Sequence, residues 1–295
     1  MRSEIVSRLA NRHHMKLDYS GIRDEDYFVL TDFTCEPSIE LLGRKDLYKV
    51  LWCRSERSSV ILDGYQCELK RNQLIFCTPL NIIEMPSTEE GFISLVFNKE
   101  FFCIQTHDDQ VSCNGFLFFG SSEPPIITLN GDQLRQYETM LEMFKSDLLI
   151  KDHLQGEMLR SSLKRLLIMS TRMITNKLPE PNISHTQMSI IRDYNILVEK
   201  HFREYHHVKD YANLLFKSPK TLSNLFPKYS DKSPLMVIND RILLEAKRLL
   251  IYSDQSAIEI AEELGYKDAS HFSKFFKKHV GMSPTIFRKS RSVAA

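Results

Sequence analysis

The sequence predicts an α+β protein of two domains, the first rich in short antiparallel strands and the second all-α. Short β-type runs broken by turn residues fill residues 27–98, with no helix expected between them. After about residue 185 the pattern is helical, and residues 208–284 repeat one helical unit twice, with Ser233-Pro234 and Ser283-Pro284 closing the two copies. A chain of 295 residues is long enough to form two separate cores.

The strand-rich region contains several apolar runs, each about as long as a β-strand. Asp63-Gly64 predicts a tight hairpin, because its turn requires positive φ and these residues tolerate it. Many short strands in succession favour an antiparallel sandwich or barrel. The strands are expected at residues 48–53, 59–62, 65–69, 72–77 and 91–97.

Two amphipathic helices are expected after the strands. Apolar side chains recur every three or four residues over 132–149 and again over 153–174. Pro179 and Pro181 then rule out continuation of the second helix. We therefore expect a first domain at 1–178, a linker at 179–186 and a helical domain at 187–295.

The first helical unit pairs a helix at 208–215 with one that begins at Pro219. Ser218 is a good N-cap and proline suits the first helical position. The second helix is expected to bury Leu222, Leu225 and Phe226. Its outward positions are then Lys220, Thr221 and Asn224, with Ser223 at the edge.

The second helical unit has stronger boundary signals. Ser256 and Glu259 form a capping box, and Gly265 stands where the chain leaves its first helix. The helix from Asp268 is expected to bury Phe272, Phe275 and Phe276 and to present Ser270, His271, Ser273 and Lys274. Each unit is thus predicted to be a helix-turn-helix.

A longer helix at 234–252 is expected between the two units. At 1.5 Å per residue it would span roughly 28 Å, close to the roughly 34 Å of one DNA turn. Such a helix could hold two recognition helices in successive major grooves.

Charge is distributed unevenly along the chain. The net charge is +1, but residues 185–295 hold 18 Lys and Arg against 12 Asp and Glu, a balance of +6. The remaining residues hold 21 against 26, a balance of −5. A basic helical third attached to an acidic remainder is expected if only that third meets phosphates.

Several other classes of protein find no support. The absence of a long apolar run or a secretory signal leads us to expect a cytoplasmic protein with no membrane partner. The six cysteines lack metal-ligand spacing and are expected to be reduced, mostly buried thiols. His13, His14, His107 and His153 do not form the arrangement of a metal-dependent cupin. We therefore expect no metal, no cofactor and no enzymatic activity.

The C-terminal hundred residues resemble the DNA-binding domain of the AraC/XylS family of transcription regulators. The match runs in order through both helical units and the helix between them, including Ser218-Pro219, Leu222, Leu225-Phe226, Ser233-Pro234, Arg241, Ala246, Arg248-Leu249-Leu250, Ile258, Ile260-Ala261, Leu264-Gly265-Tyr266, Ser270 to Lys277 and Gly281 to Pro284. Members usually carry an N-terminal cupin-like β-barrel that binds a small effector, followed by helices that dimerise. The resemblance implies a homodimeric, sequence-specific transcription regulator, with activation among its expected roles. Its expected partners are duplex DNA, a small effector and RNA polymerase.

The resemblance also assigns roles to individual residues. Asparagine can form a bidentate contact with adenine, and lysine can donate to guanine. Lysines beside the recognition helices are expected to contact phosphate instead. The base-facing residues would be Lys220, Thr221, Ser223, Asn224, Ser270, His271 and Lys274, and the phosphate contacts Lys217, Lys228, Lys267, Lys277 and Lys278.

The first unit departs from the family pattern. Pro227 interrupts the end of its recognition helix, and Asp231 replaces the common glycine before Ser233-Pro234. Asn224 also stands where the family often has arginine. The second unit is therefore expected to dock on DNA more regularly.

Two other readings remain open at the level of sequence. A DNA-binding protein controlled by a protein partner or by its abundance fits the helical half equally well. A cupin-type enzyme with an accessory helical domain would require a metal or substrate site that we do not find. The identity of an effector, and the choice between activation and repression, cannot be read from the sequence.

Overall fold

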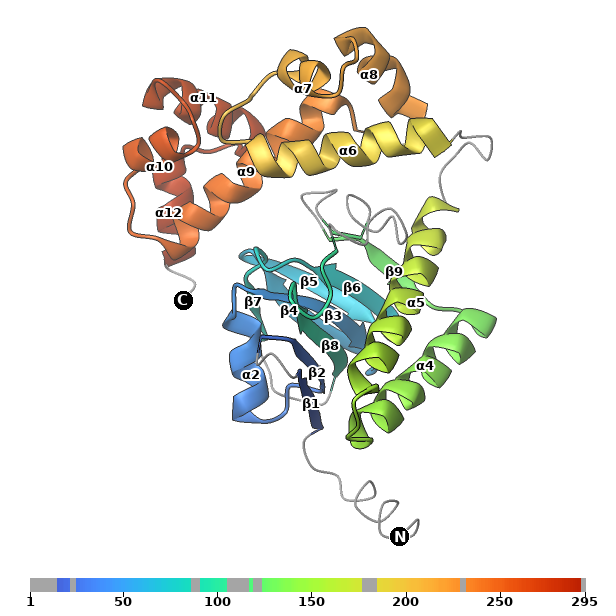
Figure 1. Ribbon diagram of the computed structural model, residues 1–295. Coiled ribbons are helices and arrows are strands. Elements are labelled where there is room, and N and C mark those ends of the chain that lie inside the picture. The colour runs from blue at the N-terminus through green and yellow to red at the C-terminus, as the bar shows by residue number, and fades with distance from the viewer. Residues whose placement is uncertain are drawn as a thin grey trace. The chain divides into compact units, whose positions relative to one another are not determined.

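A computed structural model describes residues 15–21, 25–85, 91–104, 117–118, 124–176, 185–228 and 232–292. The N-terminal region is rich in β-sheet and the C-terminal region is helical (Figure 1). The chain divides into two compact units. The first comprises Met1–Leu62, Gln66–Thr106 and Ile126–Leu166, and the second Asp63–Tyr65, His107–Pro125 and Leu167–Ala295.

Two sheets form the strand-rich region. The larger has the order β1 (Lys16–Ser20), β2 (Tyr27–Thr31), β8 (Phe92–Asn98), β3 (Leu47–Cys53), β6 (Gln73–Cys77) and β9 (Ile126–Thr128). The smaller has the order β5 (Tyr65–Lys70), β4 (Arg57–Leu62) and β7 (Ile83–Glu84). Pairing in the larger sheet is antiparallel, and Trp52 of β3 stands opposite Ile93 on β8 and Leu74 on β6.

Alternation along β3 separates two apolar layers. Leu51 and Cys53 belong to a core that also contains Val60 and Leu62 of β4 and Leu69 of β5. Val50 and Trp52, at the intervening positions, face the other way. The strands expected from the sequence are confirmed, and the predicted hairpin turns at Asp63 (φ 51°) and Gly64 (φ 78°).

The expectation that no helix interrupts the strands is wrong. Helix α2 (Glu36–Gly43) lies between β2 and β3 in sequence, with Cys35 as its N-cap and proline in its first turn. Only Ser38, Leu41 and Leu42 are buried in it. Eight residues with three inward positions are too few to give a recognisable helical period. Strands β1, β2, β7 and β9 are likewise absent from the strands expected from the sequence.

Helices α4 (Gly131–Leu149) and α5 (Gln155–Thr175) confirm the two amphipathic helices, and they lie side by side next to the larger sheet (Figure 1). Tyr137, Leu141 and Phe144 form the buried stripe of α4. No helix among the described residues is long and apolar enough to cross a membrane. The predicted linker falls largely on residues outside the described ones.

The cysteines of the described part of the chain are all free thiols. Cys53 and Cys77 are buried in the core between the sheets, whereas Cys35, Cys67 and Cys103 are half-buried. Cys113 lies outside the described residues. The expectation that the thiols are buried like small hydrophobic side chains therefore holds fully for Cys53 and Cys77.

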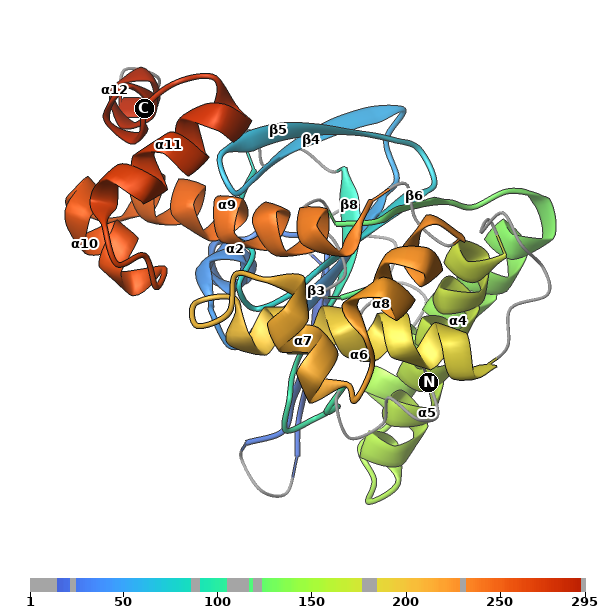
Figure 2. The same ribbon diagram turned by 90° about the horizontal axis from the view of Figure 1, so that it is seen from above.

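The helical region has one core of its own, which includes Tyr194, Tyr211, Phe226, Ile242 and Phe276. Helix α9 contacts α6, α7, α10, α11 and α12, and its length agrees with the prediction (Figure 2). The elements are α6 (His185–His201), α7 (Val208–Leu214), α8 (Pro219–Leu225), the 3₁₀ helix η1 (Phe226–Lys228), α9 (Pro234–Tyr252), α10 (Ala257–Glu263), α11 (Ala269–Val280) and α12 (Pro284–Ser292).

Candidate nucleic-acid interface

Helices α7 and α8 form the first helix-turn-helix, and α10 and α11 form the second. Burial of Leu222, Leu225 and Phe226 in the first unit, and of Phe272 and Phe276 in the second, turns the opposite faces of α8 and α11 outward. All seven predicted base-facing residues are exposed: Lys220, Thr221, Ser223, Asn224, Ser270, His271 and Lys274. Ser273, which the sequence also placed outward, is only half-exposed.

The start of α8 is fixed by its cap. The Ser218 side chain accepts a hydrogen bond from the Thr221 backbone N–H at 3.0 Å, and Pro219 occupies the first turn. The Thr221 hydroxyl lies 2.8 Å from the Ser218 hydroxyl. Thr221 is therefore engaged in the cap, which leaves Lys220 and Asn224 as the freer outward side chains of α8.

Helix α8 is short, as Pro227 predicts. It has seven residues and passes directly into η1, which contains the proline. Phe226 nevertheless stays buried, with its ring 4.9 Å from that of Tyr194 in an edge-on contact. The interruption thus shortens the recognition helix without removing its anchor. Asp231 lies outside the described residues.

Helix α11 has twelve residues and is well closed at both ends. The Ser270 backbone N–H donates to the Asp268 carboxylate at 2.7 Å, and this hydrogen bond holds the pKa of that carboxyl below its usual value. At the other end Gly281 adopts φ 85°. Lys277 and Lys278 lie in the last turn, where cations interact favourably with the helix dipole.

The predicted phosphate contacts are all on the surface. Each of these lysines is exposed and forms no ion pair with any described residue. Their charge is therefore available to a polyanion, whose backbone would attract them without regard to sequence. They are Lys217, Lys228, Lys267, Lys277 and Lys278.

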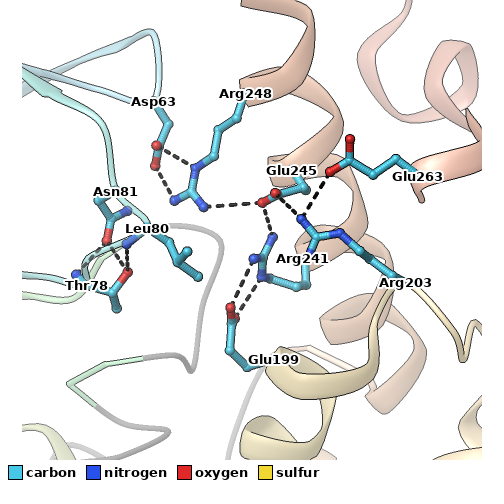
Figure 3. A network of polar contacts seen from close by, with 10 residues as sticks. All are labelled: Asp63, Thr78, Leu80, Asn81, Glu199, Arg203, Arg241, Glu245, Arg248 and Glu263. Atoms are coloured by element: carbon cyan, nitrogen blue, oxygen red, sulfur yellow. Dashed lines mark hydrogen bonds and ion pairs between the residues drawn. The ribbon is translucent and has the colours of Figure 1, made fainter. Parts of the chain in front are cut away.

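The two arginines that the family match places on α9 have another role. Arg241 binds Glu199 with nitrogen–oxygen distances of 2.7 and 3.0 Å and Glu245 at 2.9 Å (Figure 3). Arg248 binds Asp63, which belongs to the same compact unit, at 2.6 and 2.9 Å. Both arginines are buried and paired with carboxylates inside the protein, so they are not available to contact DNA.

Glu245 is the shared acceptor of this network. Besides Arg241 it receives Arg203 at 2.6 Å and lies 3.5 Å from Arg248 (Figure 3). Burial alone would raise the pKa of Glu245, but the surrounding guanidinium groups, Arg241 first, hold it below its usual value. In the sequence these arginines stand out only as part of the family resemblance. The i,i+4 spacing of Arg241 and Glu245 was the signal that could have revealed the ion pair.

The turn of the second unit packs tightly against the segment after α6. The carbonyl oxygen of Leu264 lies 2.9 Å from Nε2 of His206, whose pKa is lowered by burial. Gly265 follows with φ 78°, and a methyl group there would overlap the carbonyl oxygen of Arg203. Position 265 thus requires the glycine expected from the sequence for two reasons: φ is positive there, and there is no room for a Cβ atom.

Comparison with known proteins identifies this region. A helix-turn-helix domain family matches residues 211–290. Residues 211–290 are a helix-turn-helix domain. The match confirms the resemblance to AraC/XylS regulators that the sequence motifs indicate.

Relatives of the helix-turn-helix domain are regulators. An uncharacterized HTH-type transcriptional regulator, YobQ of Bacillus subtilis, is 31% identical over 121 residues, which cover 41% of this chain and 48% of YobQ. The raffinose operon regulatory protein RafR of Pediococcus pentosaceus is 37% identical over 83 residues, covering 28% and 30%. The chain thus covers less than half the length of these relatives.

Several solved structures align with more of the chain. Fatty-acid-bound ToxT of Vibrio cholerae aligns with 83% of this chain and 88% of its own, at 13% identity and a TM-score of 0.39. No described group of three or more His, Cys, Asp or Glu side chains could hold a metal ion, while His13, His14 and His107 lie outside the described residues.

Proposed function

We propose that this chain is a sequence-specific transcription regulator that inserts α8 and α11 into successive major grooves of duplex DNA. The observation that carries the proposal is the pair of helix-turn-helix units joined by the 19-residue α9. Both recognition helices turn exposed polar side chains outward, next to unpaired lysines. In the DNA-binding domain expected at 187–295, Asn224 and Lys274 are the first candidates for base contacts, ahead of the other outward residues.

The proposal also covers the strand-rich region. Two antiparallel sheets around one core are compatible with the cupin-like barrel expected at 1–178, where a small effector would bind. The names of the relatives indicate regulators and not enzymes. RNA polymerase is the partner that activation would require, and promoter position decides between activation and repression.

Binding is tested by titrating DNA from upstream of the neighbouring genes in a gel-shift or anisotropy assay at several salt concentrations. We expect a specific complex that weakens as salt increases, because phosphate contacts release counterions. If every sequence binds equally, or none binds, the proposal fails. Stabilisation by a metabolite in a thermal-shift screen separates an effector-controlled regulator from one controlled by abundance.

Lys274→Ala is expected to weaken specific DNA binding more than Asn224→Ala. Lys274 lies near the middle of the longer, regularly capped α11, whereas Asn224 is the next-to-last residue of a seven-residue helix. Loss of a base contact costs about 1–3 kcal/mol, or roughly 5- to 150-fold in affinity, and Lys274→Ala should fall in that range. Fluorescence anisotropy with specific and scrambled duplexes measures both variants.

The control for this comparison is Lys99→Ala, which removes an exposed positive charge from the strand-rich unit. It should leave the affinity unchanged. Equal losses from the two recognition-helix variants, or a larger loss from Asn224→Ala, would contradict the assignment of the second unit as the more regular reader.

We further propose that the chain forms a homodimer through the α4–α5 turn. Leu149, Ile150, Leu154 and Met158 gather there and are about half exposed, and contiguous exposed apolar side chains mark interaction surfaces. Met158→Glu is expected to shift the protein to monomers in sedimentation velocity. Gln136→Glu adds the same charge elsewhere on the α4 surface and should not. A monomeric parent protein would refute this proposal.

A further inference from the structure

The turn between α7 and α8 has a phenylalanine where the corresponding turn of the second unit has a glycine. Phe216, with φ 53°, follows the C-cap of α7, and Gly265, with φ 78°, follows the C-cap of α10. In both turns this residue donates its backbone N–H to a carbonyl oxygen three residues earlier at 3.0 Å, and the next N–H donates to one five residues earlier at 2.9 Å. The two turns therefore share one backbone conformation, which favours glycine.

Phe216 occupies this conformation without gaining any packing. The left-handed region is unfavourable for a residue with a Cβ, and especially for a bulky one. The side chain is 93% exposed, so no burial within the protein offsets the strain or the contact of the ring with water. Local strain that nothing in the free protein repays is typical of a functional position. We therefore expect a binding partner to cover the ring.

The surroundings of Phe216 favour DNA as this partner. The residue lies two positions before Ser218, the N-cap of α8, and two residues of chain span at most about 7 Å. Lys217 and Lys220 are exposed and form no ion pair with any described residue. No acidic residue occurs at positions 213–224. The ring is thus placed beside the recognition helix among positive charges, which attract a polyanion.

We propose that Phe216 contacts DNA and that its ring packs against the 5-methyl group of a thymine next to the bases that α8 faces. Thymine presents a methyl group in the major groove, and phenylalanine is one of the side chains that contact it. The ring has no charge and no hydrogen-bonding group, so it adds selectivity for thymine and not general attraction to phosphate. This inference rests on the proposed function and names a specificity-determining residue beyond the polar outward side chains.

Phe216→Gly is expected to change stability and DNA affinity in opposite directions. Glycine adopts the turn without strain, so the urea midpoint of the helical unit, followed at 222 nm, should rise. Loss of the ring should weaken binding to the specific duplex about threefold to tenfold, and binding to a scrambled duplex should not change. A substitution that merely disturbed α8 would lower both the midpoint and the affinity.

Lys217→Ala is the neighbouring control for contacts with phosphate. It removes a charge, so the slope of log affinity against log salt concentration should fall by about one. Phe216→Gly removes no charge, and its slope should equal that of the parent protein. Fluorescence anisotropy at several salt concentrations measures both variants on the same duplex.

Replacement of thymine by uracil tests the assigned contact directly, because it removes only the 5-methyl group. Each thymine of the specific duplex is replaced in turn, and the parent protein and Phe216→Gly are titrated in parallel. We expect a position at which the parent protein loses about threefold or more in affinity and Phe216→Gly loses nothing further. Methyl groups contacted by other side chains should affect both proteins equally.

The results separate this inference from the proposed function. Specific binding by the parent protein with equal affinity for Phe216→Gly overturns the inference alone, and so does an affinity loss that depends on no thymine. Unchanged DNA binding with reduced transcription by purified RNA polymerase would assign Phe216 to a protein partner and also overturns it. A parent protein that binds no specific duplex refutes the regulator and, with it, the contact.

Discussion

Arg241→Ala is expected to destabilise the helical unit by about 3–5 kcal/mol, because it leaves buried carboxylates without their counter-charge. The guanidinium is held between Glu199 and Glu245, and all three side chains are mostly buried. It also lies 3.9 Å from the centroid of the Phe202 ring. Urea unfolding followed by circular dichroism at 222 nm reports the helices, while Trp52 fluorescence reports the first unit separately.

Arg203→Ala is the matched control. Arg203 also pairs with Glu245 and lies over Phe202, but its side chain is 44% exposed. Exposed ion pairs contribute about 0–1 kcal/mol, so this variant should lose no more than that. If Arg241→Ala cost no more than Arg203→Ala, the buried network would not stabilise the unit.

The dependence on pH should identify Glu245 as the titrating partner. Its pKa is lowered in the folded protein, so its contribution to stability is complete above the unfolded value of 4.5. That contribution is lost as the pH falls below 4.5 through the folded pKa. In the Arg241→Ala protein, burial is no longer offset by the nearest guanidinium, so part of this acid sensitivity should disappear from the unfolding curves.

The helical unit could be predicted closely because its signals are local. Ser218, Ser256 and Gly265 fix helix ends through hydrogen bonds or positive φ within a few residues, and the structure has each of them as expected. The burial of Arg241 was missed because charge predicts exposure unless a partner is known. Glu199 lies 42 residues away, and no local pattern relates it to Arg241.

The surroundings of the aromatic residues on the strands were even harder to predict from the sequence. At their strand spacing Tyr48, Trp52, Tyr65 and Phe76 could line a cavity, but such aromatic residues more often belong to a core. In the structure Tyr48, Trp52 and Phe76 are buried, whereas Tyr65 is exposed. Alternation gives the face of the sheet on which a side chain lies, but the fit of α4 against that face depends on side-chain shapes from distant segments.

Gly265→Ala is expected to destabilise the helical unit by about 3 kcal/mol, against about 1 kcal/mol for Gly281→Ala. Both glycines have positive φ, 78° and 85°, so an alanine would introduce about the same backbone strain at either site. They differ in space, because a Cβ at Gly265 would overlap the carbonyl oxygen of Arg203, whereas a Cβ at Gly281 meets nothing within 4 Å.

Urea unfolding at 222 nm again measures both glycine variants, and Trp52 fluorescence should change in neither. The overlap involves backbone, so it can be relieved only if the turn between α10 and α11 moves away from the segment after α6. That movement would also pull the Leu264 carbonyl from His206, which it approaches to 2.9 Å. Because this carbonyl favours the charged imidazole, its loss should lower the pKa of His206 further in an NMR titration of the Gly265→Ala protein, and Gly281→Ala should leave that pKa unchanged. Equal destabilisation with an unchanged His206 would show that φ alone, and not the close approach, requires glycine at position 265.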